Sequence, residues 1–343
     1  MKIIITGGAG FIGSCVVRYA INRGDTVLNI DSLTYASCLD NLDSIKDSDK
    51  YFFEKIDICN YQSLKFSINS FQPDAIIHLA AESHVDRSIG ASLNVIETNI
   101  IGTYNLVDIF TKYWIKNNKN PSTRFIHVST DEVFGEAKNS ELFTEDTAYN
   151  PKNPYSASKA SSDHLVRAWV NTHKTPALIT NCSNNYGPFQ FPEKLIPLTI
   201  NSVRNNNRIP IYGNGKQIRD WIYVDDHVEG VFKVLDDGII GDSYNIGSNN
   251  EVTNIDLVTK ICNILDKKLD LKESSLKLIE FVKDRPGHDK RYAINSSKIR
   301  NELKWSPSLD IDEGLDKTID WYLSNGDWLD KLSDKAIVKN RLG

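Results

Sequence analysis

Cysteine is scarce in this sequence of 343 residues. Its five cysteines are odd in number and scattered, with no Cys-x-x-Cys pair, at Cys15, Cys38, Cys59, Cys182 and Cys262. This distribution indicates neither a disulfide framework nor a cysteine zinc site, so a reducing cytoplasm is the compartment that fits best. The seven histidines form no short-spaced cluster, which argues against a bound metal.

The sequence also lacks an excess of positive charge and any long hydrophobic run. Its net charge of -5 provides no overall field for nucleic acid or an anionic membrane, which favours a small anionic ligand bound by local charges. No stretch approaches the roughly 18 consecutive apolar residues that a membrane span requires. The chain opens directly into a strand-like run without a signal segment, so we expect a soluble, unprocessed protein.

What is present is an alternation of β-branched runs and amphipathic stretches, typical of a parallel sheet with crossover helices. We predict strands at 2–6, 26–30, 51–56, 75–80, 124–129 and 177–182, and helices near 11–23, 61–70, 94–116 and 156–172. The predicted fold class is therefore α/β, a Rossmann-type doubly wound parallel sheet with a smaller, mixed C-terminal substrate domain.

The pattern loosens after Asn184, where prolines punctuate the chain. We therefore predict a dinucleotide-binding domain over residues 1–183 and a mainly substrate-binding domain over 184–343. The run from Trp221 to Asp237 reads as a strand and a helix that return to the main sheet, so 221–250 is expected to rejoin the first domain.

A glycine-rich turn follows the first predicted strand, with Gly7, Gly10 and Gly13 ahead of a helix. Glycine is required where a backbone must turn sharply or approach a pyrophosphate, and the helix N-terminus then stabilises the phosphates. Asp31 ends the second strand and supplies a carboxylate that bonds a ribose 2′-hydroxyl and repels a 2′-phosphate, which selects NAD over NADP. The alternatives are an ordinary tight turn and an aspartate that caps a turn or helix.

Tyr155 and Lys159 stand four residues apart at the start of a predicted helix, on one face. A tyrosine is a weak base unless a nearby ammonium favours the phenolate, so the pair suits proton abstraction from a hydroxyl. Taken alone, the spacing is common by chance and describes many solvated helix faces. Together with the glycine turn and with Thr130 at a strand end, it resembles the extended short-chain dehydrogenase/reductase superfamily, which implies that a substrate hydroxyl binds between Thr130 and Tyr155.

Asp131 and Glu132 follow Thr130 directly, at the end of a central strand where this fold carries out its chemistry. Burial and like charge can separate the pKa values of two adjacent carboxyl groups, leaving one as an acid and the other as a base. Such a pair beside a ketone allows elimination of water. The alternative is a strand-end turn that happens to be acidic.

The whole chain resembles the dTDP-glucose 4,6-dehydratase family from Met1 to beyond Trp305. Five segments carry this resemblance: 78–88 (HLAAESHVDRS), 184–188 (NNYGP), 191–197 (FPEKLIP), 217–221 (QIRDW) and 284–289 (DRPGHD). The resemblance implies that Tyr155 deprotonates the sugar 4-hydroxyl as hydride passes from C4 to NAD. Glu132 would then remove the C5 proton while Asp131 protonates the C6 hydroxyl, and hydride would return to C6.

Further positions carry over from the resemblance. The implied NAD contacts, besides the three glycines, Tyr155 and Lys159, are Phe11, Ile12, Asp31, Ser32, Leu33, Thr34, Asp57, Ile58, Leu79, Ala80, Ala81, Glu82, Ser83, Thr98 and Asn185. The implied substrate contacts are Ser83, Thr130, Asn184, Lys194, Leu195, Pro210, Ile211, Tyr212, Arg219, Asn254, Asp284, Arg285 and His288. Arg219 and Arg285 offer planar forks for diphosphate oxygens, although isolated arginines are more often surface charges.

Four other histidines, His78, His84, His127 and His164, are interpreted as packed or structural. Small departures from the family pattern occur at Phe134 and Phe189, where tyrosine is common, and in the loop 135–143, which looks short. These departures leave the catalytic positions untouched but could alter how the sugar is positioned.

Two rival functions share these features. A nucleotide-sugar 4-epimerase or decarboxylase would keep the cofactor site and Tyr155 with Lys159 but lack the Asp131–Glu132 pair. A silent NAD-binding protein would lose catalytic residues that are all present here. The expected ligands are NAD and dTDP-glucose, with no metal and no nucleic acid; the thymine preference and a rhamnose-type pathway come from the resemblance alone. Helices near 94–116 and 156–172 resemble those the family pairs in a homodimer.

Overall fold

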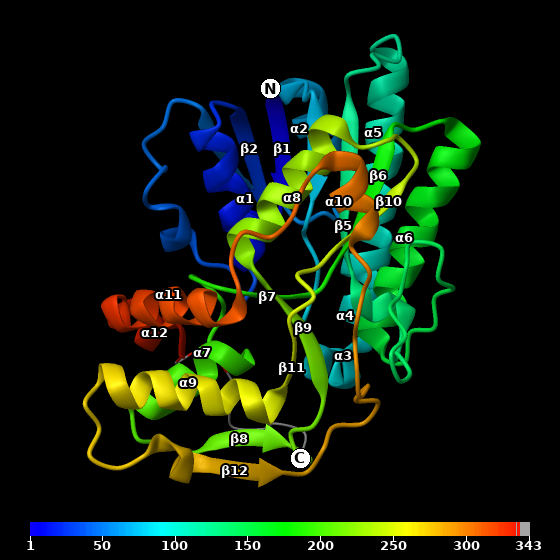
Figure 1. Ribbon diagram of the computed structural model, residues 1–343. Helices are drawn as coiled ribbons and strands as arrows, with labels where there is room; N and C mark the ends of the chain where they lie inside the picture. Colours follow the sequence, from blue (N-terminus) through cyan, green and yellow to red (C-terminus); the bar gives the residue numbers. More distant parts are fainter. Residues whose placement is uncertain (334, 337–343) are drawn as a thin grey trace.

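The computed structural model describes residues 1–333, 335 and 336. Seven parallel strands form one sheet in the order β10-β6-β5-β4-β1-β2-β3 (Figure 1). They are β1 (Lys2–Thr6), β2 (Thr26–Asp31), β3 (Tyr51–Lys55), β4 (Ala75–His78), β5 (Arg124–Thr130), β6 (Ala177–Cys182) and β10 (Ser243–Ile246). The order reverses between β1 and β4, which is the switch point where this fold class binds ligands. The predicted fold class is confirmed.

Helices cover both faces of this sheet. They are α1 (Phe11–Asn22), α8 (Val224–Asp237) and α10 (Ser297–Leu303) on one face, and α2 (Tyr61–Phe71), α5 (Thr103–Lys116) and α6 (Pro154–His173) on the other. Ile3 and Ile5 pack into the first core, whereas Ile4 packs into the second, because successive side chains of a strand point to opposite faces. Burial on both faces explains why the strands read as continuous apolar runs.

The smaller part lies below the carboxyl ends of the large sheet (Figure 1). It contains the three-stranded sheet of β7 (Asn184–Tyr186), β9 (Ile218–Tyr223) and β11 (Glu251–Thr253), and the pair β8 (Ile209–Tyr212) and β12 (Ile279–Val282). Its helices are α7 (Leu195–Arg204), α9 (Asn254–Lys268), α11 (Ile311–Ser324) and α12 (Gly326–Ser333), while α3 (Val85–Gly90) and α4 (Ser92–Ile96) follow β4. In the described part of the chain, no helix is long and apolar enough to cross a membrane.

The six predicted strands are all present, although the fourth ends at His78 rather than at residue 80. The predicted helix 94–116 is interrupted by a π-helical stretch over Glu97–Gly102. In this stretch Asn99 turns inward and its amide donates to Glu82 O and Ser158 Oγ at 3.0 and 2.9 Å. A single π turn of this kind is often found at functional sites.

In the run 221–237, the strand does not return to the main sheet, contrary to the prediction. That strand, β9, pairs with β7 and β11 in the smaller sheet, and only the helix α8 packs on the large one. The physical reason is alternation: Trp221 and Tyr223 pack into the core of the smaller part, while Ile222 and Val224 pack into that of the larger. The segment that rejoins the large sheet is β10, which lies beside β6.

Candidate active site

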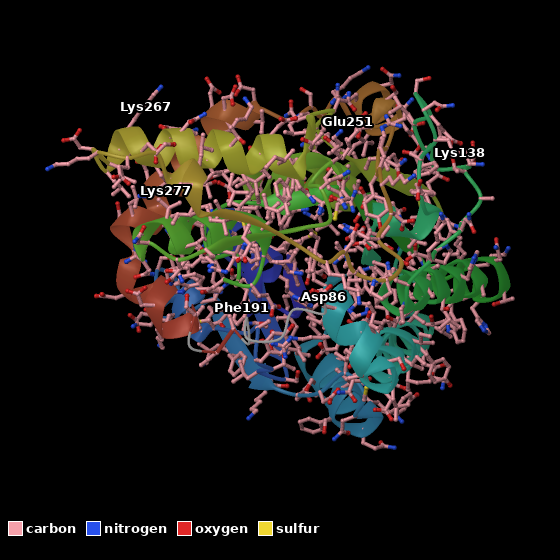
Figure 2. All side chains as sticks on the ribbon, turned by 90° about the horizontal axis from the view of Figure 1, so that it is seen from below. Asp86, Lys138, Phe191, Glu251, Lys267 and Lys277 are labelled. Atoms are coloured by element: carbon pink, nitrogen blue, oxygen red, sulfur yellow. The ribbon has the colours of Figure 1, made fainter. Side chains whose placement is uncertain are left out.

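A cavity of about 840 Å³ lies at the carboxyl ends of β1, β2, β4, β5 and β6, where they face the smaller part. Its wall includes residues from the glycine turn, from the ends of these strands, from the start of α6 and from the segment 182–194. In the view from below, Phe191 of this wall and Asp86 of α3 lie within the outline of the molecule, whereas Lys267 lies near its edge (Figure 2).

The glycine turn at one end of the cavity has the shape that a dinucleotide requires. Gly7 has a φ of +75°, and a Cβ there would lie 2.8 Å from the backbone of Ala80. A Cβ on Gly13 would lie 2.0 Å from the carbonyl oxygen of Gly7, so only glycine allows α1 to approach the turn this closely. Gly10 caps α1 without a side-chain bond, which leaves the first N–H groups of the helix available to phosphates.

Asp31 lies at the edge of the same cavity and holds the loop that follows β2. Its Oδ2 accepts a hydrogen bond from the N–H of Ala9 at 3.0 Å, and its Oδ1 accepts from Leu33 N and Ser37 Oγ at 2.7 and 2.9 Å. A carboxylate fixed in this way beside the glycine turn is placed to bond a ribose hydroxyl. The residues present therefore fit NAD.

Thr130, Tyr155 and Lys159 all line the cavity. Thr130 is the last residue of β5, and Tyr155 is the second residue of α6, which begins at Pro154 and has a capping box between Asn153 and Ser156. Lys159 follows one turn later, is buried, and its Nζ donates to the carbonyl of Val128 at 2.8 Å. The helix start therefore brings the predicted base and the strand end together.

The electrostatics of Tyr155 differ from the sequence-based expectation. Desolvation, followed by the charges of Glu132, Cys182 and Asp131, raises the pKa of Tyr155 well above its usual value, and a hydrogen bond with Thr130 opposes this rise. The main influences on this pKa do not include the expected lowering by Lys159, whose amine donates to the Val128 carbonyl.

The two adjacent carboxyl groups occupy different environments. Glu132 lines the cavity, and the hydroxyl of Tyr292 donates to it at 3.5 Å. Asp131 is 2% exposed and lies behind the cavity wall rather than in it. Burial, then the charge of Glu132, raises the pKa of Asp131 well above its usual value. The site thus holds one buried carboxyl group with a raised pKa beside one that faces the cavity, an arrangement that suits an acid and a base.

Of the residues implied as NAD contacts, all but Leu33 line the cavity. They are Gly7, Gly10, Phe11, Ile12, Gly13, Asp31, Ser32, Thr34, Asp57, Ile58, Leu79, Ala80, Ala81, Glu82, Ser83, Thr98, Tyr155, Lys159 and Asn185. Leu33 adopts a left-handed conformation, with φ of +57°, and contributes its N–H to Asp31.

The implied substrate contacts divide into two groups. Ser83, Thr130, Asn184 and Lys194 line the cavity, and Lys194 Nζ donates to Ser83 O at 3.4 Å. The structure does not bring the others to its wall: they are Leu195, Pro210, Ile211, Tyr212, Arg219, Asn254, Asp284, Arg285 and His288.

Several of these outer residues contact protein groups. Arg285 Nη1 lies 3.2 Å from Asp86 Oδ1, and Tyr212 donates to the same carboxylate at 2.8 Å. Arg219, expected to face diphosphate oxygens, is buried and donates to backbone carbonyls, including that of Asp289 at 2.9 Å. His288 Nδ1 lies 2.6 Å from Asp284 Oδ1. Ile211 packs in the core of the smaller part, so its side chain is turned away from any ligand.

Three histidines and Phe134, which stood out in the sequence, make structural contacts. His78 and His127 are fully buried, and His84 caps α3 by accepting from the N–H of Arg87 at 3.3 Å. Phe134 packs against Phe143 inside a small core, outside the cavity wall.

Sequence reasoning missed part of the wall. These residues are Ile30, Ala36, Ser37, Ile56, Cys59, Asn94, Glu97, Ile101, Val128, Ser129, Cys182, Ser183, Gln190, Phe191 and Glu193. Most stand within two residues of a predicted contact. Extending each predicted contact by two positions in both directions would therefore have found them. Phe191 and Glu193 lie in the segment 191–197 that carries the resemblance, whereas Gln190 reaches the wall through the fold of the loop after β7, which leaves no local signal.

Comparison with known proteins gives consistent matches over the whole chain. The family described as GDP-mannose 4,6-dehydratase matches residues 4–318. A dTDP-glucose 4,6-dehydratase of Shigella flexneri is 52% identical, covering 97% of this chain and 95% of that protein. The solved structure of a dTDP-glucose 4,6-dehydratase of Streptomyces venezuelae with NAD bound is 38% identical, with a TM-score of 0.89, covering 97% of this chain and all of that one.

A UDP-glucose 4-epimerase of Thermotoga maritima, solved with UDP-glucose, is 25% identical with a TM-score of 0.84 and covers 95% of this chain and 99% of that one. The fold is thus shared by dehydratases and an epimerase, while the identity is higher with the dehydratases.

Replacing Gly13 tests the dinucleotide site. We expect Gly13→Ala to weaken NAD binding by more than about tenfold, because the new methyl group would displace the Gly7 carbonyl and with it the turn. Isothermal titration calorimetry with NAD measures the change. Gly90→Ala is the control, since nothing lies within 4 Å of a Cβ there. Equal NAD affinity in both variants would contradict the assignment.

Proposed function

This chain belongs to the family described as GDP-mannose 4,6-dehydratase, and from that premise we infer that it converts dTDP-glucose into dTDP-4-keto-6-deoxyglucose and water with NAD as cofactor. The glucose nucleotide is inferred rather than the mannose one because a relative 52% identical over nearly the whole chain is a dTDP-glucose 4,6-dehydratase. The enzyme is a carbon–oxygen lyase that uses its cofactor without consuming it.

One observation carries the choice of dehydration over epimerisation. Asp131 and Glu132 follow Thr130 directly, one buried with a raised pKa and the other at the cavity wall beside Tyr155. Removal of water from neighbouring carbons requires a base for one proton and an acid for the departing hydroxyl. A 4-epimerase requires neither group, so this pair distinguishes the two reactions.

The first part of the reaction belongs to Tyr155 and Thr130. Bound NAD supplies a reversible hydride acceptor at the sugar carbon. Thr130 and Tyr155 share a hydrogen bond, and we propose that a sugar 4-hydroxyl enters between them, with Tyr155 as its base. Lys159 would bond the ribose of the cofactor once its amine leaves the Val128 carbonyl.

The second part belongs to the two carboxyl groups. The 4-ketone acidifies the proton on C5, and Glu132 is proposed to remove it. Asp131, whose pKa is raised well above its usual value by burial, is proposed to deliver a proton to the C6 hydroxyl, so that water leaves. This step requires Asp131 to move toward the cavity, since its side chain lies behind the wall.

We further propose how the chain is divided into domains, in which compartment the enzyme acts and which pathway its product serves. A division near residue 183 is supported by the separate cores of the two parts, with β10 rejoining the first. A cytoplasmic location is supported by five free cysteines. The product, a 4-keto-6-deoxy sugar nucleotide, suits the biosynthesis of rhamnose-type deoxysugars.

A homodimer is proposed from the surface of the segment 92–116. Four of its large apolar side chains are exposed, with Leu93, Ile96, Ile101 and Tyr104 at 63, 45, 47 and 39%. Contiguous exposed apolar surface of this kind marks interaction sites. The segment packs beside α6, so the pairing would lie close to the helix that carries Tyr155.

Turnover of dTDP-glucose tests the function directly. We expect the purified protein with NAD to yield a sugar nucleotide lighter by one water, visible by mass spectrometry. Parallel reactions with UDP-, CDP- and GDP-glucose measure the base preference. A galactose nucleotide of unchanged mass would contradict dehydration and favour the epimerase.

Glu132→Gln separates elimination from cofactor binding. We expect NAD affinity to stay the same while the rate of water loss falls by more than about a hundredfold, because the amide cannot accept the C5 proton. Mass spectrometry follows the product and calorimetry follows NAD. Glu136→Gln is the matched control, since Glu136 pairs with Lys152 at 3.5 Å outside the cavity wall. Full dehydration by the Glu132 variant would remove Glu132 from the mechanism.

Light scattering tests the dimer. We expect about twice the chain mass of 38.7 kDa at micromolar concentration. Leu93→Glu should reduce the mass to that of a monomer, because it places a charge in the apolar surface. Ile239→Glu alters a residue that is 58% exposed outside this segment and should leave the dimer intact. A monomeric parent protein would overturn the proposal.

A further inference from the structure

Asp163 is a buried carboxylate to which the proposed mechanism gives no role. It is 0% exposed and stands in α6 four residues after Lys159 and eight after Tyr155. Residues four apart lie on the same face of a helix, so Asp163 lies one turn beyond Lys159 on the side that meets the sheet. A buried charge is costly unless it is paired and hydrogen-bonded, so its contacts define its purpose.

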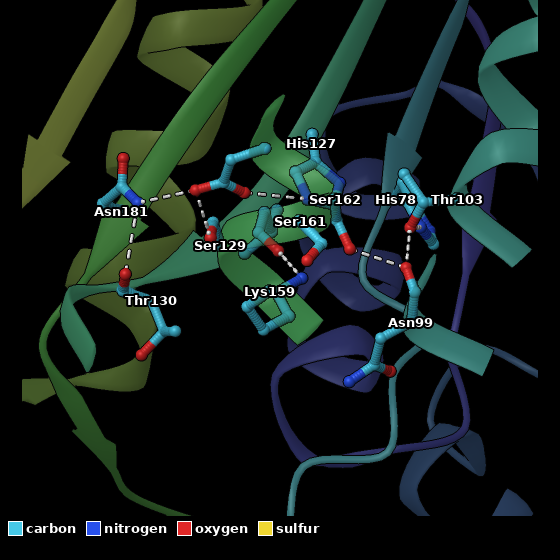
Figure 3. Close-up of polar contacts among 12 residues, drawn as sticks. His78, Asn99, Thr103, His127, Ser129, Thr130, Lys159, Ser161, Ser162 and Asn181 are labelled. Carbon is cyan, nitrogen blue, oxygen red and sulfur yellow. Dashed lines mark hydrogen bonds and ion pairs between the residues drawn. The ribbon is translucent and has the colours of Figure 1, made fainter. Parts of the chain in front are cut away.

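The contacts of Asp163 join three parts of the chain. Its Oδ2 accepts hydrogen bonds from Ser129 Oγ at 2.9 Å, from the Tyr149 hydroxyl at 2.8 Å and from Asn181 Nδ2 at 3.3 Å. Its Oδ1 lies 3.2 Å from His127 Nε2. Figure 3 shows Ser129 and His127 of β5 and Asn181 of β6 together in this region.

Two of these contacts lead directly to Thr130. The amide of Asn181 that bonds Asp163 also donates to the carbonyl oxygen of Thr130 at 3.1 Å, and Ser129 is its neighbour in the strand (Figure 3). The carboxylate therefore connects the helix that carries Tyr155 and Lys159 to the strand end that carries Thr130. The distance between these catalytic groups depends on this connection.

The electrostatic influences on Lys159 also point to Asp163. Burial lowers the pKa of Lys159, and the charge of Asp163 opposes this, followed by that of Cys182. His127 does not neutralise Asp163, because burial, then Lys159, lowers the pKa of His127 to about 4 and leaves it uncharged. His78, whose ring lies 5.2 Å from that of His127, has its pKa lowered well below the usual value by burial.

The remaining nearby groups do not replace Asp163. Arg167 donates to the Tyr149 hydroxyl at 2.9 Å. Burial, then the charge of Asp163, moves the pKa of Tyr149 above its usual range, and the charge of Arg167 only partly opposes this rise, so that hydroxyl stays neutral. Lys159, in the cavity wall, and Asp163, one helical turn behind it, are thus the buried opposite charges of this region.

We propose that Asp163 is a positioning residue for the reaction, acting as the counter-ion that keeps Lys159 charged inside the protein and as the anchor that holds Thr130 opposite Tyr155. It touches neither the cavity nor any ligand within it. The consequence for catalysis rests on the proposed function, whereas the consequence for the charge of Lys159 does not.

Asp163→Asn tests the counter-ion directly, because it removes the charge and keeps the shape. We expect the titration midpoint of Lys159 to fall by about one pH unit or more, since an opposite charge favours the ionised amine. NMR of protein labelled with ¹³C-lysine measures it, with the Lys159 signal assigned by its loss in Lys159→Arg. An unchanged midpoint would overturn the counter-ion role.

Asp226→Asn is the matched control. Asp226 is 3% exposed and accepts hydrogen bonds from Ser308 N and Oγ and from Leu309 N, far along the sequence from the cavity wall. This variant should lose stability through its unpaired donors but leave the Lys159 midpoint unchanged. A midpoint that moves equally in both variants would show a general loss of structure and contradict the proposal.

Steady-state kinetics test the anchor. For Asp163→Asn we expect kcat on dTDP-glucose to fall on the order of tenfold to a hundredfold with KM nearly unchanged, because Thr130 and Lys159 shift while the rest of the cavity wall does not. Asn181→Ala, which keeps the charge and cuts the link to Thr130, should lower kcat without moving the Lys159 midpoint. Unchanged kcat in Asn181→Ala would overturn the anchoring role of Asp163. This test holds even if the Asp163→Asn variant does not fold.

The two proposals fail separately. If the parent protein does not dehydrate dTDP-glucose, the proposed function fails, yet the Lys159 titration still decides whether Asp163 is its counter-ion. If the parent protein is active and the Asp163→Asn variant matches it in midpoint and kcat, the positioning role fails alone.

Discussion

Helix α6 packs a polar face, not an apolar one, against the carboxyl ends of β5 and β6, and the position of the catalytic groups depends on this contact. Ser156, Ser158, Lys159, Ser162 and Asp163 of this helix are all buried; Lys159 and Asp163 bond residues of β5, while Ser158 and Ser162 bond Asn99. Each unpaired polar group in such a place would cost about 1–3 kcal/mol, so the face fits only in a register that satisfies its hydrogen bonds. A purely apolar helix face could slide, whereas this one fixes Tyr155 relative to Thr130.

Burial also governs the chemistry, because the surroundings of two neighbouring carboxyl groups give them different roles. Asp131 and Glu132 are neighbours in the chain, but the first is buried and the second lines the cavity. Burial stabilises the protonated form of one and leaves the other facing the ligand space. Since the reaction returns to its starting redox state, the protein needs no site for an external electron donor, only a cavity in which the cofactor and the sugar meet.

Much of this arrangement could be predicted from the sequence, because its signals are local. The strands follow from apolar runs such as Lys2–Thr6, the dinucleotide site from Gly7, Gly10 and Gly13, and the acid–base pair from its place after Thr130. Short elements gave weaker signals: β10 has four residues and was missed, and the π-helical stretch depends on the inward turn of Asn99.

The remaining differences arise from contacts between distant residues. Arg285 lies 199 positions from its partner Asp86, and Arg219 bonds backbone carbonyls some 70 positions away, so no spacing rule could reveal either contact. Asp163 was overlooked for a related reason. Its partners come from two strands and a loop that only the fold brings together, and a lone aspartate in a helix is indistinguishable from a surface charge in the sequence.

The central claim is that Tyr155, Thr130 and the carboxyl pair use oxidation at C4 only to allow loss of water, with the cofactor restored within each turnover. A crossover experiment tests this most directly: dTDP-glucose carrying deuterium at C4 is mixed with unlabelled dTDP-glucose of different ¹³C content and incubated with the enzyme. Our account predicts that deuterium appears at C6 of the same molecule that carried it at C4. Deuterium lost to water, retained at C4, or found on the other substrate's product would contradict it.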